Sequence, residues 1–356
     1  MAHLLVIRFS ALGDVAMTIP VIHAFATQYP QHKLTVVSRA SFAPLFIDMP
    51  DNVHFKGIDL KRYSGLRGLS QLYQTIQEGN RFDAVADWHN VLRTRFLRFR
   101  FRLSGIPVAV INKDRRAKHR LTRAKNKVLH PLQTSTERYA DVLAQLGYPV
   151  QLTFTSLFAG KPTVASPLTG PKPAGEQWIG IAPFAQHKGK IYPTLSMEQV
   201  IKQLSGRTNI RLFLFGGGNY EKALCEQWAS QYPRTISLIG KGTMRDELTI
   251  MHSLDLLLSM DSANMHLASI AGTPVLSVWG ATHPYAGFMG WKQNPDNALQ
   301  TDLPCRPYSV YGNKPCLRGD YACLTQIKPA QIVDHMDRML HTAAKATPSP
   351  TDPDLQ

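Results

Sequence analysis

The stretch over residues 256–282 limits most strongly what this chain can fold into. Three leucines from residue 256 predict a buried strand. Asp261 and Ser262 then begin a helix, Gly272 ends it, and a second apolar run follows. A strand, a helix and a strand in this order are typical of a parallel α/β sheet. Because ligands bind such sheets at the edge where the strands end, the polar residues after the first strand are candidates for a binding site.

The start of this helix has two interpretations. The first N–H groups of a helix have no partner within it, so those of Ser262, Ala263 and the next residue form a site for a phosphate. His266, one turn further on, can point the same way. Alternatively, Asp261 or Ser262 simply caps the helix and His266 is an ordinary surface histidine. The pattern alone leaves both interpretations open.

The same stretch resembles the nucleotide-binding signature of bacterial heptosyltransferases, glycosyltransferase family 9. That signature runs D-[ST]-G-x-x-H-x-A-x-x-x-G-x-P and continues into a G-x-T-x-P turn. The chain matches it at Asp261, Ser262, His266, Ala268, Gly272, Pro274, Gly280, Thr282 and Pro284. It departs at Ala263, where the family usually has Gly, and the added methyl group narrows the approach of the backbone to a pyrophosphate. The resemblance implies that Asp261, Ser262, Ala263 and His266 bind the donor nucleotide.

A second motif lies near the start of the chain. Residues 3–9 predict a short buried strand, and from Asp14 the apolar spacing becomes helical. Asp14 therefore stands at a strand-to-helix junction, where a negative charge complements the helix dipole. The segment also resembles the family's opening, R-x-S-x-[LI]-G-D-[VI]-x-x-x-x-P. In that family the matching aspartate is the proposed general base, so the resemblance implies this catalytic role for Asp14.

The rest of the chain alternates strands and helices, which predicts an α/β fold with parallel sheets covered by helices on both faces. We expect a first Rossmann-like, doubly wound domain over residues 1–159 and a second over 177–326. Between them, residues 160–176 are rich in Pro and Gly and predict a linker. A last helix is expected over 327–345 and a disordered tail over 346–356. The resemblance implies that this is the GT-B architecture, with two domains facing across a cleft.

Two lysines and a glutamate complete the expected donor site. Lys188 and Lys190 lie in a polar loop, and Lys190 precedes Tyr192 and a proline. Family members carry a lysine shortly before an aromatic residue and a proline, so the resemblance implies that Lys190 neutralises the departing diphosphate. The match does not exclude Lys188, two residues earlier, from the same role. Glu221 follows three glycines and fits the glutamate that contacts the nucleotide in this family. Without the resemblance, these residues are surface lysines and a tight turn.

The charge of the chain predicts a polyanionic partner. The formal net charge is +15, and the excess is concentrated in two segments. Arginine alternates with Phe and Leu over residues 93–103, and residues 113–127 hold eight lysines and arginines against Asp114. Arginine forks bind phosphates and carboxylates, which favours an acceptor site. We expect that site to include Arg93, Arg115, Arg116 and Arg120.

Other interpretations of the basic segments stay open. Basic residues interleaved with Phe and Leu also fit the surface of an anionic membrane, and a solvated helix face is a third possibility. Nucleic acid is not expected as a partner, because the sequence holds no recognition motif for it. The resemblance to the heptosyltransferase family implies an anionic glycolipid acceptor and a peripheral position on the inner face of the inner membrane.

Further features bear on compartment and chemistry. The chain contains no apolar run long enough to span a membrane, and its start lacks the apolar core of a signal peptide, so we expect a cytoplasmic protein. We also expect a monomer. Cys305, Cys316 and Cys323 lack the paired spacing of a zinc site. There is no D-x-D pair that would indicate a bound metal ion. We expect neither a metal nor another cofactor.

The resemblance implies an inverting, metal-independent glycosyltransferase that moves a heptose from an ADP-activated donor to the inner core of lipopolysaccharide. Three alternatives remain. The enzyme could use another nucleotide sugar, or the chain could bind nucleotide or anionic glycolipid without turnover. Ala263 and the pair Gln186-His187 favour a non-catalytic protein, whereas Asp14 and Lys190 argue against it. A sugar-nucleotide epimerase on the same fold would leave the basic segments unexplained.

Overall fold

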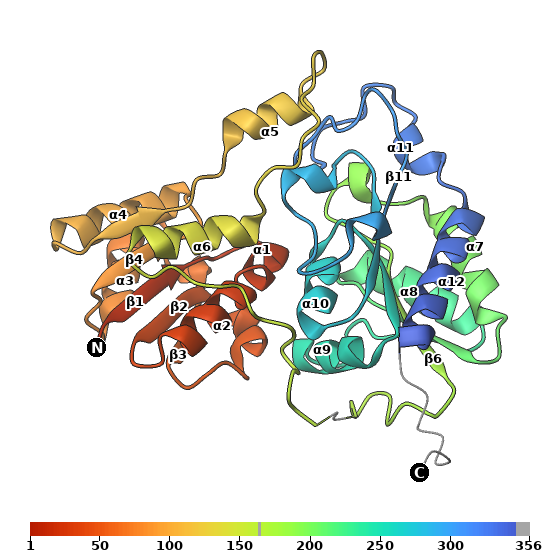
Figure 1. The fold of residues 1–356 in the computed structure, drawn as a ribbon, viewed down its shortest axis with the longest axis horizontal. Coiled ribbons are helices and arrows are strands. Elements are labelled where there is room, and N and C mark those ends of the chain that lie inside the picture. Colours follow the sequence, from red (N-terminus) through yellow and green to blue (C-terminus); the bar gives the residue numbers. More distant parts are fainter. Residues whose placement is uncertain (163–164, 347–356) are drawn as a thin grey trace, which may run out of the picture. The chain divides into compact units, whose positions relative to one another are not determined.

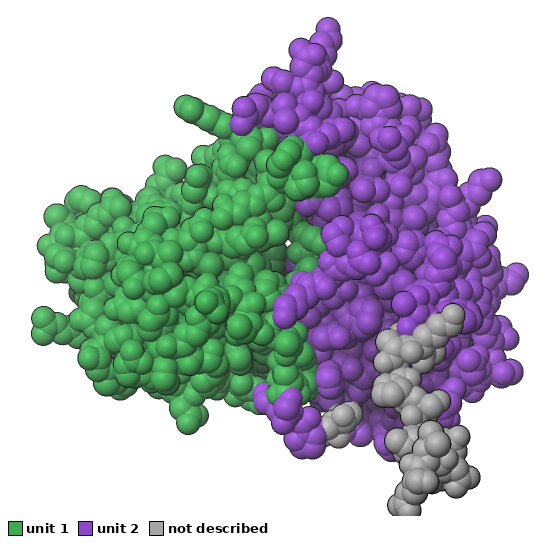
Figure 2. Space-filling view, in the orientation of Figure 1, with its two compact units in different colours: residues 1–118, 130–159, 285–291 green, residues 119–129, 160–284, 292–356 purple. Residues whose placement is uncertain are grey.

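The computed structural model describes residues 1–162 and 165–346 and divides into two compact α/β units. Unit 1 combines residues 1–118, 130–159 and 285–291 (Figure 2). Unit 2 contains the other described residues, from 119–129, 160–284 and 292 onward. The units are therefore not continuous in sequence, unlike the expected ranges 1–159 and 177–326. One boundary falls inside a helix, between Lys118 and His119.

Unit 1 is built on a five-stranded parallel sheet with the strand order β3-β2-β1-β4-β5 (Figure 1). Its elements are β1 (His3–Ile7), α1 (Leu12–Ala16), α2 (Ile19–Gln28), β2 (Lys33–Arg39), η1 (Ala40–Phe46), β3 (Val53–Ile58), η2 (Leu60–Arg62), α3 (Gly65–Gln77), β4 (Ala84–Asp87), α4 (Leu92–Leu103), β5 (Val108–Val110), the start of α5 (Arg115–Thr122) and α6 (Ser135–Gln145). The chain runs outward from β1 to β3 and then returns to β4 on the other side of β1. The carboxyl ends of β1 and β4 thus form a topological switch point, where open α/β sheets bind ligands.

Unit 2 is built on a six-stranded parallel sheet with the order β11-β10-β9-β6-β7-β8. Its elements are β6 (Gln177–Ala182), η3 (Lys188–Lys190), α7 (Thr194–Ser205), β7 (Ile210–Leu214), α8 (Asn219–Gln231), β8 (Thr235–Ser237), α9 (Met244–Ser253), β9 (Leu256–Met260), α10 (Ala263–Ala271), β10 (Val275–Trp279), η5 (Pro295–Asn297), β11 (Ala298–Gln300), α11 (Ala322–Thr325) and α12 (Pro329–Ala346). Here the chain reverses between β6 and β9, which creates a second switch point. The expected α/β fold with two doubly wound sheets is confirmed.

The central strands of both sheets are buried on both faces. In β1 the residues from Leu4 to Ile7 are completely buried, and every residue of β9 and β10 is buried. Such continuous apolar strands are typical of parallel sheets that helices cover on both sides. Polar side chains can therefore reach solvent or a ligand only beyond the strand ends, which is where both sequence motifs lie.

The helix expected from Asp14 onward is divided in two. α1 ends at Ala16 and α2 begins at Ile19, with Thr18 as its N-cap residue. The cause is Pro20, which has no N–H group and whose ring excludes the carbonyl of the residue four positions earlier from a continuous helix. That residue is Ala16, where α1 ends. Asp14 consequently lies in a short helix of its own.

Residues 285–291 belong to unit 1 although the neighbouring chain belongs to unit 2. Leu132 donates its N–H to the carbonyl of Tyr285 at 2.9 Å, and Ser135 donates to the carbonyl of Gly287 at 2.9 Å. Gly287 has φ +81, and a Cβ atom there would overlap the backbone of Gln133. A residue without a side chain is needed for this close contact. Of the expected tail, Ala346 ends α12 and residues 347–356 lie outside the described residues.

Candidate active site

The strand–helix junction of unit 2 has the predicted boundaries. α10 covers Ala263–Ala271 after the N-cap residue Ser262, and Gly272 ends it in the left-handed conformation with φ +89. The side chain of Ser262 makes no capping hydrogen bond, and its Oγ lies 3.3 Å from that of Ser259. His266 is buried, with 6% of its surface exposed, so it is not a surface histidine. The first N–H groups of α10 are thus left for another partner.

Asp261 does not cap the helix either. Its carboxylate accepts a hydrogen bond from Oγ1 of Thr282 at 2.8 Å and pairs with Nζ of Lys190 at 3.0 Å. Only 4% of Asp261 is exposed, so the ion pair is shielded from water. The three residues lie on the loops that follow β9, β10 and β6. The structure therefore brings Lys190 to the predicted nucleotide-binding stretch.

Close backbone contact holds these loops together. Ala281 donates its N–H to the carbonyl of Gly189 at 2.8 Å, and a Cβ atom at Gly280 would overlap that same carbonyl. Arg306 donates from Nη2 to the carbonyl of Thr282 at 2.8 Å. The G-x-T turn of the motif is thus needed for packing as well as for its threonine hydroxyl.

Lys188 and Glu221 have other contacts. Nζ of Lys188 lies over the ring of Tyr321, 5.1 Å from its centroid, so it is not the lysine that pairs with Asp261. Glu221, near the start of α8, accepts a hydrogen bond from the N–H of Gly217 at 2.7 Å, and burial raises the pKa of its carboxyl. Because β7 lies beside β6 in the sheet, the start of α8, which carries Glu221, lies at the same edge as Lys190.

In unit 1, Asp14 is held at the switch point between β1 and β4. Nη2 of Arg8 lies 2.6 Å from a carboxylate oxygen of Asp14, and Nη1 of Arg8 donates to the carbonyl of Trp88 at 2.8 Å. The same carboxylate accepts the N–H of Ala11 at 3.1 Å. The side chain of Arg8 is 8% exposed and that of Asp14 is 30% exposed. The acid is therefore fixed by a buried cation and still reachable from solvent.

His89 is a further residue of this edge that the sequence analysis missed. Its ring Nε2 lies 3.3 Å from Oγ of Ser10, and its backbone N–H donates to a carboxylate oxygen of Asp87 at 2.9 Å. Burial lowers the pKa of His89 to about 3, and the nearby charges of Arg8 and Lys113 act in the same direction. The imidazole is thus neutral. Its position directly after the end of β4 was the signal that could have found it.

Cations outnumber carboxylates around Asp14. Lys118 is buried, with Nζ 4.3 Å from the centroid of the Phe288 ring. Burial and the nearby charge of Arg138 lower the pKa of Lys118 to about 8, and Asp14 acts in the opposite direction. Burial and Arg8 lower the pKa of Lys113 as well. A half-buried group of cations of this kind is suited to bind an anion.

The predicted acceptor residues lie on α4 and α5. Arg115, Arg116 and Arg120 are exposed on α5, and Arg93 is partly exposed near the start of α4. Arg120 belongs to unit 2. Sequence reasoning selected arginines by their density, and it could not distinguish the buried side of α5, which carries Lys118, from the exposed side.

Comparison with known proteins decides the family. The sequence model of glycosyltransferase family 9 (heptosyltransferase) matches residues 70–314. The chain belongs to this family. It is 23% identical over 349 residues to lipopolysaccharide heptosyltransferase 3 of Escherichia coli, covering 94% of this chain and 98% of that protein. As a member of family 9, it is a glycosyltransferase.

Similarity to solved structures of other proteins shows the fold of this chain. The glycosyl transferase family 9 protein of Veillonella parvula matches with a TM-score of 0.70 at 17% identity, covering 96% of this chain and 98% of that one. The E. coli heptosyltransferase WaaC, solved with ADP, matches with a TM-score of 0.67 at 16% identity, covering 95% and 99%. The fold is therefore GT-B, as expected.

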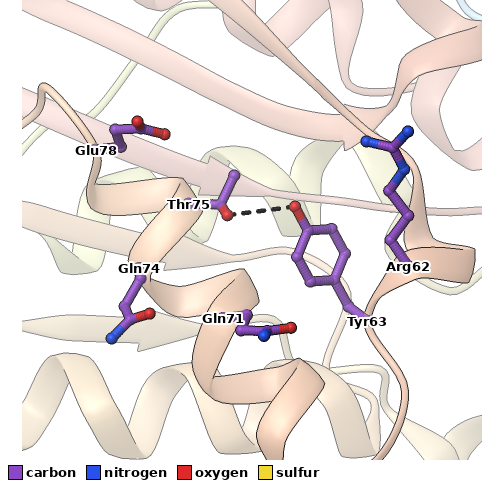
Figure 3. Close-up of a pocket in the computed structure, with 6 residues that line it drawn as sticks. All are labelled: Arg62, Tyr63, Gln71, Gln74, Thr75 and Glu78. Atoms are coloured by element: carbon purple, nitrogen blue, oxygen red, sulfur yellow. Dashed lines mark hydrogen bonds between the residues drawn. The ribbon is translucent and has the colours of Figure 1, made fainter.

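Other features of the family 9 chain lie outside these sites. A pocket on unit 1 is lined by Arg62, Tyr63, Gln71, Gln74, Thr75 and Glu78, with the Tyr63 hydroxyl 3.2 Å from that of Thr75 (Figure 3). It is formed by η2 and α3 rather than by the strand ends that carry Asp14.

Within residues 1–162 and 165–346 there is no cluster of three or more potential metal ligands. None of the helices in these ranges combines the length and the apolar character that a membrane span requires.

Proposed function

We propose that this chain transfers a heptose from an ADP-activated donor to the inner core of lipopolysaccharide. Its family, the name of its E. coli relative and the ADP in the WaaC structure support this reaction. The observation that carries it is the Asp14 carboxylate, held by buried Arg8 at a switch point and surrounded by an excess of cations. Such an arrangement suits a base that acts on an anionic acceptor.

Unit 2 would hold the donor. The N–H groups at the start of α10 would bind the diphosphate, supported by the helix dipole. Lys190 pairs with Asp261, from which it can turn toward the diphosphate while Thr282 keeps its hydrogen bond to Asp261. The ammonium group would then neutralise the negative charge that grows on the departing ADP. Glu221 would contact the ribose or the base.

Unit 1 would hold the acceptor. Asp14 would accept the proton of the attacking hydroxyl while that oxygen forms its bond to the anomeric carbon. The bond from this carbon to the diphosphate breaks at the same time, and its electron pair leaves with ADP, so the configuration is inverted. Lys113 and Lys118 would bind phosphates or carboxylates of the acceptor, with Arg115 and Arg116 as outer contacts. Because the acceptor is lipid-linked, the enzyme would work on the cytoplasmic face of the inner membrane.

The test is a transfer assay with ADP-heptose, GDP- and UDP-sugars, and a Kdo–lipid A acceptor with and without a first heptose. ADP release that depends on the acceptor, together with a heptosylated product by mass spectrometry, is the expected result. Transfer from a different nucleotide sugar would overturn the proposed identity of the donor but not the proposed class of reaction. Epimer formation or nucleotide release independent of acceptor would overturn the transfer reaction itself.

A further inference from the structure

Helix α4 presents an apolar stripe to solvent. Leu92, Phe99 and Leu103 are 80%, 59% and 68% exposed. Spacings of seven and eleven residues place them within about 40° of one another around a helix. The opposite face carries Leu97 and Phe101, which are completely buried against unit 1. The helix, labelled in Figure 1, is therefore apolar on two sides, and only one of them is buried.

Arginines border the exposed stripe on both sides. On an ideal helix Arg95 and Arg102 fall on one flank, and Arg93 and Arg100 on the other. Arg95 and Arg102 are exposed, whereas Arg100 lies over the ring of Tyr73, 4.8 Å from its centroid. The sequence of the helix, LRTRFLRFRFRL, contains no acid. An apolar stripe between two rows of cations has the charge and polarity of a helix that lies in the interface of an anionic bilayer.

We propose that α4 is the surface by which this protein docks on an anionic membrane, with Leu92, Phe99 and Leu103 inserted among the lipids and the arginines at the headgroups. This goes beyond the proposed transfer reaction, because it requires only the helix and a bilayer. A second copy of the chain is a poor occupant, since two such helices would bring arginines against arginines. Nucleic acid fits the charge but offers nothing for three exposed apolar side chains.

Vesicle co-sedimentation tests the proposal with the full-length protein. The vesicles are phosphatidylcholine, with or without phosphatidylglycerol. The first variant replaces Leu92, Phe99 and Leu103 with Ser, and the second carries Arg95→Ser and Arg102→Ser. A matched apolar control carries Leu195→Ser and Leu317→Ser, which are 76% and 75% exposed in unit 2. A matched charge control carries Lys202→Ser and Lys241→Ser, both exposed in unit 2.

The wild-type protein and both controls should bind the anionic vesicles, with much weaker binding to phosphatidylcholine alone. Each α4 variant should lose roughly tenfold or more in partition coefficient. Because all the replaced side chains are exposed, the variants should keep their circular dichroism spectra and melting temperatures. Unchanged vesicle binding by both α4 variants, or equal losses in the controls, would overturn the docking surface. Tighter binding of an RNA or DNA duplex than of vesicles would also overturn it, if the α4 substitutions weakened duplex binding and left vesicle binding unchanged. No donor or acceptor is present, so the result is independent of the transfer reaction.

Discussion

Arg8 and Asp14 form an ion pair of 2.6 Å that joins the end of β1 to the short helix α1. The guanidinium also donates to the carbonyl of Trp88, so the pair bridges the ends of β1 and β4. The buried guanidinium of Arg8 fixes the carboxylate in position, and the candidate base is thus part of the structure of unit 1.

Asp14→Asn should lower the rate of transfer by roughly 10²–10⁴, because the amide cannot accept a proton. Its oxygen can still accept a hydrogen bond from Arg8, so we expect the fold to survive with a loss of about 1–3 kcal/mol in the free energy of unfolding. ADP binding, measured by calorimetry, should not change. The matched control is Asp59→Asn, another aspartate of unit 1 that accepts a backbone N–H near a short helix. Near-normal turnover of Asp14→Asn would show that this residue is only structural.

Lys190→Gln should raise the dissociation constant for ADP by roughly tenfold or more, because a charged hydrogen bond to the diphosphate is worth about 1.5–3 kcal/mol. Lys188→Gln is the matched control and should change it little, since Lys188 lies over Tyr321 instead of pairing with Asp261. Removing Lys190 also leaves Asp261 buried without its cation, which destabilises unit 2. The double variant Lys190→Gln/Asp261→Asn should recover stability in a thermal melt without recovering ADP affinity. If the double variant recovered both its stability and its ADP affinity, Lys190 would have a structural role.

Ser262→Phe should weaken ADP binding, because a large side chain at the N-cap position of α10 blocks access to its first N–H groups. His266→Ala should weaken it as well. The matched control for the bulky change is Ser230→Phe, on the exposed last turn of α8. ADP titrations by calorimetry measure all three. If Ser262→Phe and Ser230→Phe bind ADP equally well, the start of α10 is not part of the donor site.

The acceptor affinity should fall as the pH rises through about 8, the pKa of Lys118, because the ammonium that would bind the acceptor anion is then lost. Lys118→Arg should remove this step from the profile of the acceptor KM, since arginine stays charged. Stability should change in the opposite direction. Between pH 8 and 10.5 the unfolded chain still holds the proton that the folded Lys118 has released, so the wild-type protein gains stability as the pH rises.

Thermal melts of the wild type and Lys118→Arg across this range check the second part of the prediction. The groups that act on Lys118 are Arg138, Asp14, Asp114 and Lys113, and the last of these also titrates at high pH. A parallel profile of Lys113→Met separates its contribution. An acceptor KM that is flat in the wild type between pH 7 and 9.5 would exclude Lys118 from the acceptor site.

The sequence by itself determined the local elements of the stretch over residues 256–282, because the boundaries of α10 follow from Ser262 and Gly272. Near the start of the chain, the strand expected over residues 3–9 ends at Ile7, and Pro20 divides the expected helix into α1 and α2. Caps, helix breakers and hydrophobic periodicity act within one or two turns, so a short segment contains the information needed. The alternation of strands and helices likewise predicted two parallel sheets, because few folds accommodate that order. The roles of the site residues stay predictions.

Only the tertiary structure decided which of these segments meet. Lys190 contacts Asp261 because β6 lies beside β9, and Arg8 reaches Trp88 because β1 lies beside β4. Strand order depends on the packing of the whole unit, which no local pattern specifies. The same is true of residues 285–291, which join unit 1 through backbone hydrogen bonds and a close contact at Gly287 that no local pattern specifies. It also holds for the basic segments, where burial separates Lys118 from the exposed arginines of α5 although their side chains carry the same charge.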